Sequence, residues 1–294
     1  MNKQLRDTLN NASKRFGSAL TNTAKSFASL LRMIVLSRYS VARQANYYPE
    51  LKSCKSCTIL ANGPSLKKAF EGGEVHYESN DVFAVNMFVQ SPEFWRIKPK
   101  FYCLVDGAYF SPNKERTKGL VKILSEAFVK VDWDMYLFIS AGCVNSGVLK
   151  GLNNSHIKVI RWNTTAFEGF QDLCYFMFRH NLAMPRCQTV INMALVAAIN
   201  MGYENIYLYG ADHSWTRDLR VDDENEVCYG DRHVYATSVE VIKKEGTIGR
   251  LLHAFANMFD AHWVINGYAV SRGVNIWNCT RDSFVDAYPR KYDF

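Results

Sequence analysis

The chain has 294 residues, of which 48% are apolar and 14% aromatic, a composition that excludes an intrinsically disordered protein and suffices for a sizeable hydrophobic core. No apolar run reaches the roughly 20 residues needed to cross a bilayer, and no secretory signal is visible. We therefore expect a cytoplasmic protein whose eight cysteines are mostly buried, reduced thiols.

The net charge of +7 is concentrated near the N-terminus. Residues 1–50 contain eight basic and two acidic side chains, so the rest of the chain is almost neutral. A near-neutral body has no basic footprint for nucleic acid, and we expect no nucleic-acid partner.

Residues 1–50 are the first predicted unit, a basic amphipathic helical arm. Apolar side chains recur at helical spacing from Leu5 to Val35, between polar and basic residues. Such a helix suits an anionic membrane surface, which would make the protein peripheral to the inner face of the inner membrane. The pattern equally fits a helix packed on the body or on a second subunit of a homo-oligomer, and both interpretations stay open.

The second predicted unit, residues 51–294, alternates strands with helices. The predicted strands are 58–60, 82–85, 101–105, 135–139, 157–160, 205–209 and 263–266, followed by a closing segment at 275–279. The predicted helices start at residue 65 and span 119–130, 170–180, 190–201 and 238–259. This alternation predicts an α/β fold, with an open, mostly parallel sheet and helices on both faces.

The segment from Cys57 to Leu66 is the most informative part of the chain. A short apolar strand breaks at Asn62 and Gly63, where glycine lets the backbone approach a ligand closely, and a helix follows. Ser65 is predicted to cap that helix. A strand, a glycine turn and a helix start favour a nucleotide-type anion site, although an ordinary strand-to-helix turn has the same pattern.

Polar residues follow four of the predicted strands: Asn62, Asn86, Asp106 and Asp212. In an open parallel sheet these positions share the edge where ligands bind. Each is weak evidence alone because Asn and Asp are common in turns. Together they predict a hydrogen-bonding pocket for a nucleotide.

The polar stretch 213–237 is predicted to be an irregular lid. His233 lies near its end, where a histidine on a closing flap could act as a general base, and His213 is the second candidate. The acidic run of Asp222, Asp223 and Glu224 is interpreted as a solvated loop rather than a metal site, and no metal is expected.

These motifs together resemble the bacterial sialyltransferases of glycosyltransferase family 42. The resemblance rests on Ala61–Leu66, on Asn86 within Ala84–Phe88, on Thr189 before a helix ending at Met201–Tyr203, and on Glu204–Asp212. It spans about residues 57–240, and Trp277–Phe284 resembles the family's closing segment. Similar motifs occur in other bacterial surface-polysaccharide proteins and in a pterin pyrophosphokinase group.

The resemblance implies a Rossmann-like domain of the GT-A type with a lid, a CMP-activated sugar as co-substrate, and inverting, metal-independent transfer. It implies that His233 takes the proton of the acceptor hydroxyl. The implied nucleotide-sugar site comprises Asn62, Gly63, Ser65, Asn86, Asp106, Thr189, Gly210, Asp212, Ser214, Tyr229 and Tyr235.

The chain departs from the family where two tyrosines would contact the leaving phosphate. His213, Ser214 and Trp215 follow Asp212 instead, so Tyr229, Tyr235 or a nearby arginine would have to donate. The donor sugar could therefore be sialic acid, Kdo or another acidic sugar.

We predict an inverting glycosyltransferase acting on a bacterial surface glycan or a lipid-linked glycan acceptor. One rival is a pyrophosphokinase-like phosphoryl transferase that depends on ATP and Mg²⁺, with Asp106, Asp212 or the Asp222–Asp223 pair as ligands. The other is a non-catalytic assembly module with a vestigial pocket.

Overall fold

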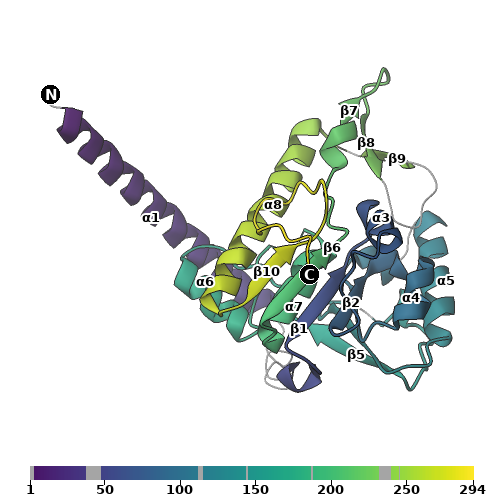
Figure 1. The fold of residues 1–294 in the computed structure, drawn as a ribbon. Coiled ribbons are helices and arrows are strands. Elements are labelled where there is room, and N and C mark those ends of the chain that lie inside the picture. Colours follow the sequence, from purple (N-terminus) through teal and green to yellow (C-terminus); the bar gives the residue numbers. More distant parts are fainter. Residues whose placement is uncertain are drawn as a thin grey trace.

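A computed structural model describes residues 3–37, 48–111, 115–143, 145–186, 188–231, 240–244 and 246–294. Seven strands within these residues form a parallel sheet in the order β10-β6-β1-β2-β3-β4-β5 (Figure 1). They are β1 (Ser56–Leu60), β2 (Asp81–Val85), β3 (Phe101–Leu104), β4 (Met135–Ser140), β5 (Ile157–Trp162), β6 (Asn205–Tyr209) and β10 (Asn275–Asn278). The predicted α/β fold is confirmed.

Helices cover both faces of this sheet (Figure 1). The α-helices are α1 (Lys3–Leu36), α3 (Ser65–Glu71), α4 (Pro92–Ile97), α5 (Glu115–Val129), α6 (Gln171–Arg179), α7 (Val190–Met201) and α8 (Ile248–Ser271). Short 3₁₀ turns are η2 (Asn86–Gln90), η3 (Gly107–Tyr109), η4 (Gly147–Leu149) and η5 (Trp215–Asp218). Gly202 ends α7 in the left-handed conformation, as predicted.

The hydrophobic core consists of two clusters, one on each face of the sheet, because successive side chains of the central strands point to opposite faces. In β2, Phe83 and Val85 join the cluster beneath α7, whereas Val82 and Ala84 join the cluster beneath α4 and α5. Because successive side chains of a strand point to opposite faces, one buried strand supplies both clusters. Nearly every side chain of α7 is buried, so this helix anchors the first cluster.

The strand order reverses beside β1. The chain lays β2 to β5 in sequence on one side of β1, and then returns to place β6 and β10 on the other side. Parallel strands end at one edge, here called the carboxyl edge. In sheets of this type, ligands bind at that edge where the order reverses, which here is between β1 and β6.

The predicted irregular segment after Asp212 is partly wrong. It contains a three-stranded antiparallel sheet of β7 (Arg220–Val221), β8 (Val227–Asp231) and β9 (Glu240–Lys244). The polar composition hid these strands because a small exposed sheet needs few apolar residues.

Two predictions after this sheet are also wrong. The predicted helix 238–259 starts late, at Ile248, where the Thr247 hydroxyl accepts the Arg250 N–H at 3.3 Å. The predicted strand 263–266 lies inside α8, where His262, Ile265 and Tyr268 are buried at helical spacing. The closing segment at 275–279 is strand β10.

The N-terminal arm is the helix α1, which extends away from the body at its N-terminal end (Figure 1). Residues 38–47 lie outside the described residues, so the predicted division of the chain near residue 50 stays a prediction. Within the described part of the chain, no helix is both long enough and apolar enough to cross a membrane. The cysteines described there are all free thiols.

Candidate functional site at the carboxyl edge

The loops after β1 and β6 are joined directly at the point where the strand order reverses. The Gly63 N–H donates to the Gly210 carbonyl at 2.8 Å, next to a 2.9 Å bond from the Ala61 N–H to the Tyr209 carbonyl. A Cβ on Gly63 would lie 1.8 Å from Asp212 Oδ2 and 2.5 Å from the Gly210 oxygen. Glycine is therefore required at position 63 for the two loops to meet.

Ser65 and Asp212 form the side-chain link between the same loops. Ser65 Oγ donates to Asp212 Oδ2 at 2.7 Å, and the Ser65 N–H donates to Oδ1 at 3.2 Å. The predicted helix-capping role of Ser65 is wrong, because Pro64 occupies the cap position and Ser65 is the first residue of α3. Burial raises the pKa of the Asp212 carboxyl, and the Ser65 bonds only partly offset this.

Asn62 and Asn86 meet at the ends of β1 and β2. Asn62 Nδ2 donates to the Val85 carbonyl at 3.0 Å, which places its amide beside Asn86. Asn86 adopts a left-handed backbone with φ of 48°, a conformation that asparagine tolerates. The Oδ1 atoms of Asn62 and Asn86 are buried and accept no hydrogen bond within the described residues. Such unpaired buried acceptors are costly unless a ligand pairs them.

Thr189 caps the N-terminus of α7, and α7 packs on β1, β2 and β3. Its side chain and that of Asn192 form a reciprocal capping box, in which Asn192 Oδ1 accepts the Thr189 N–H at 3.2 Å. Asn192 is fully buried, and its Nδ2 donates to no partner within the described residues. Sequence reasoning missed Asn192, although its position three residues after Thr189 is the spacing of a capping box.

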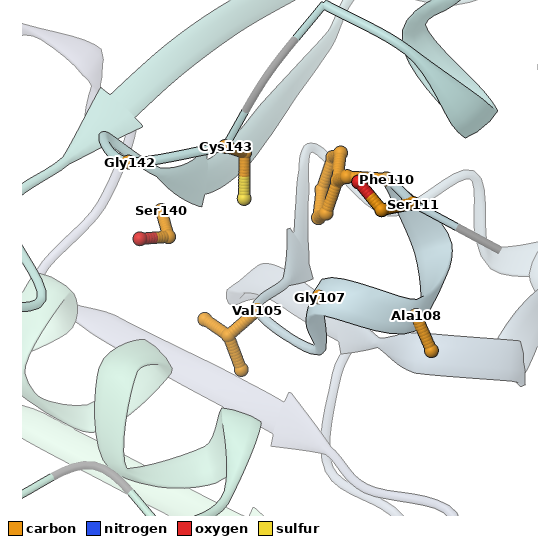
Figure 2. A pocket seen from close by; sticks show the side chains of 8 residues that line it. All are labelled: Val105, Gly107, Ala108, Phe110, Ser111, Ser140, Gly142 and Cys143. Atoms are coloured by element: carbon orange, nitrogen blue, oxygen red, sulfur yellow. The ribbon is translucent and has the colours of Figure 1, made fainter. Parts of the chain in front are cut away.

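A pocket of about 660 Å³ lies farther along the carboxyl edge, beyond β3 and β4. Ser140 and Cys143 line it from the β4 side, with Phe110 and Ser111 across from them (Figure 2). Asp106, an exposed residue directly before the lining Gly107, accepts the Ala108 N–H at 2.9 Å. Asp106 thus lies beside the pocket, with one carboxylate oxygen tied to the local turn.

The family model of the 6-hydroxymethylpterin diphosphokinase MptE-like proteins matches residues 35–218, which is well over half of the chain. The chain belongs to the MptE-like family. This is the pterin group whose motifs resemble those of the chain, and membership of glycosyltransferase family 42 stays a prediction. No curated protein matches the sequence.

Two solved structures are similar to this MptE-like chain. The MAf glycosyltransferase from Magnetospirillum magneticum AMB-1 is 14% identical, with a TM-score of 0.49, over 86% of this chain and 38% of that one. The sialyltransferase CstII from Campylobacter jejuni, solved with the substrate analogue CMP-3FNeuAc, is 14% identical, with a TM-score of 0.42, over 82% of this chain and 87% of that one. The chain thus spans well under half of the MAf protein, and likenesses this distant carry no argument about activity.

The lid of this MptE-like chain is described in part. His233 and Tyr235 lie outside the described residues, so their roles stay predictions. Tyr229 in β8 contacts the Phe255 ring of α8 edge-on, with ring centroids 6.3 Å apart. Ser214 precedes η5, whose Trp215 stacks on the same Phe255 at 5.9 Å. Among its described contacts, Ser214 has none with Asn62 or Asp212.

The acidic run at 222–224 lies in the turn between β7 and β8. Asp222 accepts the Glu226 N–H at 2.8 Å and pairs with Lys243 at 3.4 Å. The hydrogen bond with Glu226, followed by the bonds from Cys228 and Lys243, lowers the pKa of Asp222 despite some desolvation. Asp223 and Glu224 are exposed, as expected for a solvated turn.

A buried chain of two histidines and a tyrosine supports the loop after β6. His213 Nε2 lies 3.1 Å from His262 Nε2, and His262 Nδ1 lies 2.9 Å from the Tyr288 hydroxyl. Burial lowers the pKa of His262 to about 4, and burial together with the nearby His262 holds the pKa of His213 well below its usual value. Sequence reasoning missed this chain because its three members are far apart in the sequence.

The C-terminal segment holds the Asp212 loop from a third side. Thr280 Oγ1 accepts the Ala211 N–H at 3.1 Å, and Ser283 Oγ donates to the Ala211 carbonyl at 2.6 Å. The Phe284 N–H donates to the Asp212 carbonyl at 2.9 Å. The backbone that positions the Asp212 carboxylate is therefore fixed on both sides.

Proposed function

We propose that the carboxyl edge binds a nucleotide-activated substrate, and that the chain transfers a sugar from a CMP-linked donor to a bacterial surface glycan with inversion. The observation that carries the proposal is the pair of unpaired buried oxygens of Asn62 and Asn86, beside the Ser65–Asp212 link. A nucleoside supplies the missing donors, because ribose hydroxyls and the cytosine amino group both carry polar hydrogens.

The described residues suit a leaving phosphate as well as a nucleoside. The unpaired Asn192 Nδ2 and the N-terminal amides of α7 can donate to developing negative charge. In the proposed step the acceptor oxygen bonds to the anomeric carbon as the bond from that carbon to the phosphate oxygen breaks. His233 takes the acceptor proton and the donors of the edge receive the CMP leaving group, with no metal in the step.

A thermal-shift panel tests the nucleotide site. CMP, UDP, GDP and ATP are each added with and without Mg²⁺. Of the four, only CMP is expected to raise the midpoint of thermal unfolding, and to do so without Mg²⁺. A nucleotide at 100 times its dissociation constant adds about 2.7 kcal/mol of stability. Asn62→Ala should abolish the CMP shift, whereas Asn154→Ala, at an amide that bonds Phe128 and Val131, should keep it. An equal CMP shift in wild type and Asn62→Ala would contradict the proposal.

His233→Ala tests the proposed base. We expect this variant to lose sugar transfer by orders of magnitude while its CMP affinity stays nearly unchanged. An unchanged transfer rate would remove His233 from the mechanism.

The family match supports a second candidate, transfer of diphosphate from ATP to a hydroxymethylpterin-like alcohol. It uses the same nucleotide edge, where Asp106 or Asp212 would hold the Mg²⁺ that neutralises the phosphates of ATP. Asp222 is less suited because Glu226 and Lys243 already engage it. A midpoint shift by ATP that requires Mg²⁺, without a shift by CMP, would select this candidate, and no shift by any nucleotide would favour a non-catalytic module.

A further inference from the structure

The helix α1 faces the body with its small polar side chains. Ser29 Oγ donates to the Glu168 carbonyl at 3.0 Å, and Ser26 Oγ accepts the Phe170 N–H at 3.0 Å. A Cβ on Gly169 would lie 2.0 Å from Ser26 Oγ, so helix and loop are in direct contact there. These specific bonds fix the rotation of α1 about its axis.

Most of the large apolar side chains of α1 point away from the body, whereas Leu30 and Met33 pack against its core. Phe16, Leu20, Phe27, Leu31 and Ile34 are between 51% and 73% exposed. They are separated by four, seven, four and three residues, so they line one face of the helix, here called the apolar stripe. A helix that merely packed on its own domain would bury this stripe, so the stripe serves contact with something outside the described body.

Charge distinguishes between the possible occupants of the apolar stripe. The helix sequence has six basic residues and a single acidic one, Asp7. Lys25 is exposed and Arg32 half-exposed, seven residues apart and therefore on one side of the helix. Two copies joined through the apolar stripe would place side by side two helices that each have six basic residues and only one acidic residue. An anionic lipid surface supplies both the apolar layer and the opposite charge.

We propose that α1 lies in the interface of an anionic membrane, with the apolar stripe among the acyl chains and the basic side chains at the headgroups. The serine contacts then hold the body at a fixed orientation to the membrane. The proposal is independent of the reaction at the carboxyl edge.

Co-sedimentation with lipid vesicles tests the proposal on the full chain. Wild type should bind phosphatidylcholine vesicles that contain about 30% phosphatidylglycerol, and should bind pure phosphatidylcholine at least tenfold more weakly. The triple variant Leu20→Gln/Phe27→Gln/Leu31→Gln should lose at least tenfold in bound fraction. The matched control Val129→Gln/Val270→Gln, at apolar residues 70% and 69% exposed elsewhere, should bind like wild type.

A charge variant separates the two contributions. Lys25→Glu/Arg32→Glu should weaken binding to the anionic vesicles and remove its salt dependence in part. Circular dichroism and gel filtration of every variant check that folding and mass are unchanged. Failure of wild type to bind anionic vesicles, or equal binding by the triple variant, would overturn the proposal. So would a wild-type dimer that the triple variant converts to monomers, because the stripe would then belong to a second copy.

Discussion

At the β1–β6 end of the carboxyl edge, hydrogen bonds and the Ser65–Asp212 link join the two loops, whereas at the β3–β4 end the loops, joined where Ser146 Oγ donates to the Phe110 carbonyl, also line a pocket of about 660 Å³. The first end has a glycine contact, a serine–aspartate link and a buried histidine pair. The second end is lined by uncharged side chains with hydroxyl, thiol and apolar groups. One sheet edge thus has a tightly hydrogen-bonded end at β1 and β6, here called the rigid end, and an open pocket at β3 and β4, here called the spacious end.

We infer from this contrast a division in binding: the two ends bind different parts of the reacting molecules. The rigid end suits the part of a substrate that does not vary, such as a nucleotide, because preorganised donors and acceptors bind without reordering. The spacious end suits the group that is transferred, or the acceptor molecule that receives it. Three predictions test this division, two at the β1–β6 end and one at the pocket.

Gly63→Ala should have the largest effect. The new Cβ would overlap the Asp212 carboxylate and the Gly210 carbonyl, so the two loops must separate. We expect a loss of about 4 kcal/mol in the free energy of unfolding, measured by urea denaturation, with loss of nucleotide binding. Gly107→Ala is the matched control at the pocket, where a Cβ would meet nothing within 4 Å. Equal losses in both variants would contradict the division.

Lowering the pH should have the second-largest effect, a loss of stability caused by the buried histidines of the rigid end. His213 and His262 have pKa values below that of an unfolded histidine, so the unfolded chain binds more protons as the pH falls below about 6.5. The stability that these neutral rings allow is complete above about pH 6.5 and is lost towards pH 4, by about 3 kcal/mol for His262 alone.

Urea unfolding at a series of pH values measures this loss. His262→Gln, which cannot titrate, should reduce the dependence between pH 6.5 and 4, and the buried His213 should retain part of it. A pH dependence of undiminished size in His262→Gln would show that other groups cause it.

Cys143→Phe should have the smallest effect on stability. The half-exposed Cys143 side chain borders open space, so a phenyl ring can enter the pocket at a cost within about 0.5 kcal/mol. Nucleotide binding should persist, and transfer should fall at least tenfold because the ring occupies the space of the second group. Cys143→Ala should retain transfer. Loss of nucleotide binding in Cys143→Phe would show that the two ends are one site.

Sequence patterns predict the sheet well because its strands are buried. The strand 205–209 and the helix 190–201 were predicted with their observed bounds, since apolar runs bounded by Gly202 and Gly210 leave little choice. Asn62, Asn86 and Asp212 lie on neighbouring strand ends because parallel strands share one edge, whereas Asp106 lies farther along that edge, beside the pocket. The apolar runs and the glycines that bound them lie within a few residues of one another, so they can be recognised directly in the sequence.

Long-range contacts explain what the sequence did not predict. Ser65 seemed a helix cap because its intended partner, Asp212, is 147 residues away. The run at 263–266 seemed a strand because its three apolar or aromatic residues, Trp263, Val264 and Ile265, suit either structure. The buried His262 and Tyr268 on either side identify it as helix. Nothing in the sequence indicates that the Oδ1 atoms of Asn62 and Asn86 are buried without a hydrogen-bond donor.

The bonds from Thr280, Ser283 and Phe284 to the Asp212 loop have a consequence for biosynthesis. The ribosome synthesises β1 and β6 well before these three residues. The nascent chain can therefore assemble most of its sheet while the Asp212 loop still lacks these hydrogen bonds. Nucleotide binding should therefore first become possible near the end of translation, and a chain terminated before β10 should have the strands from β1 to β6 but no working site.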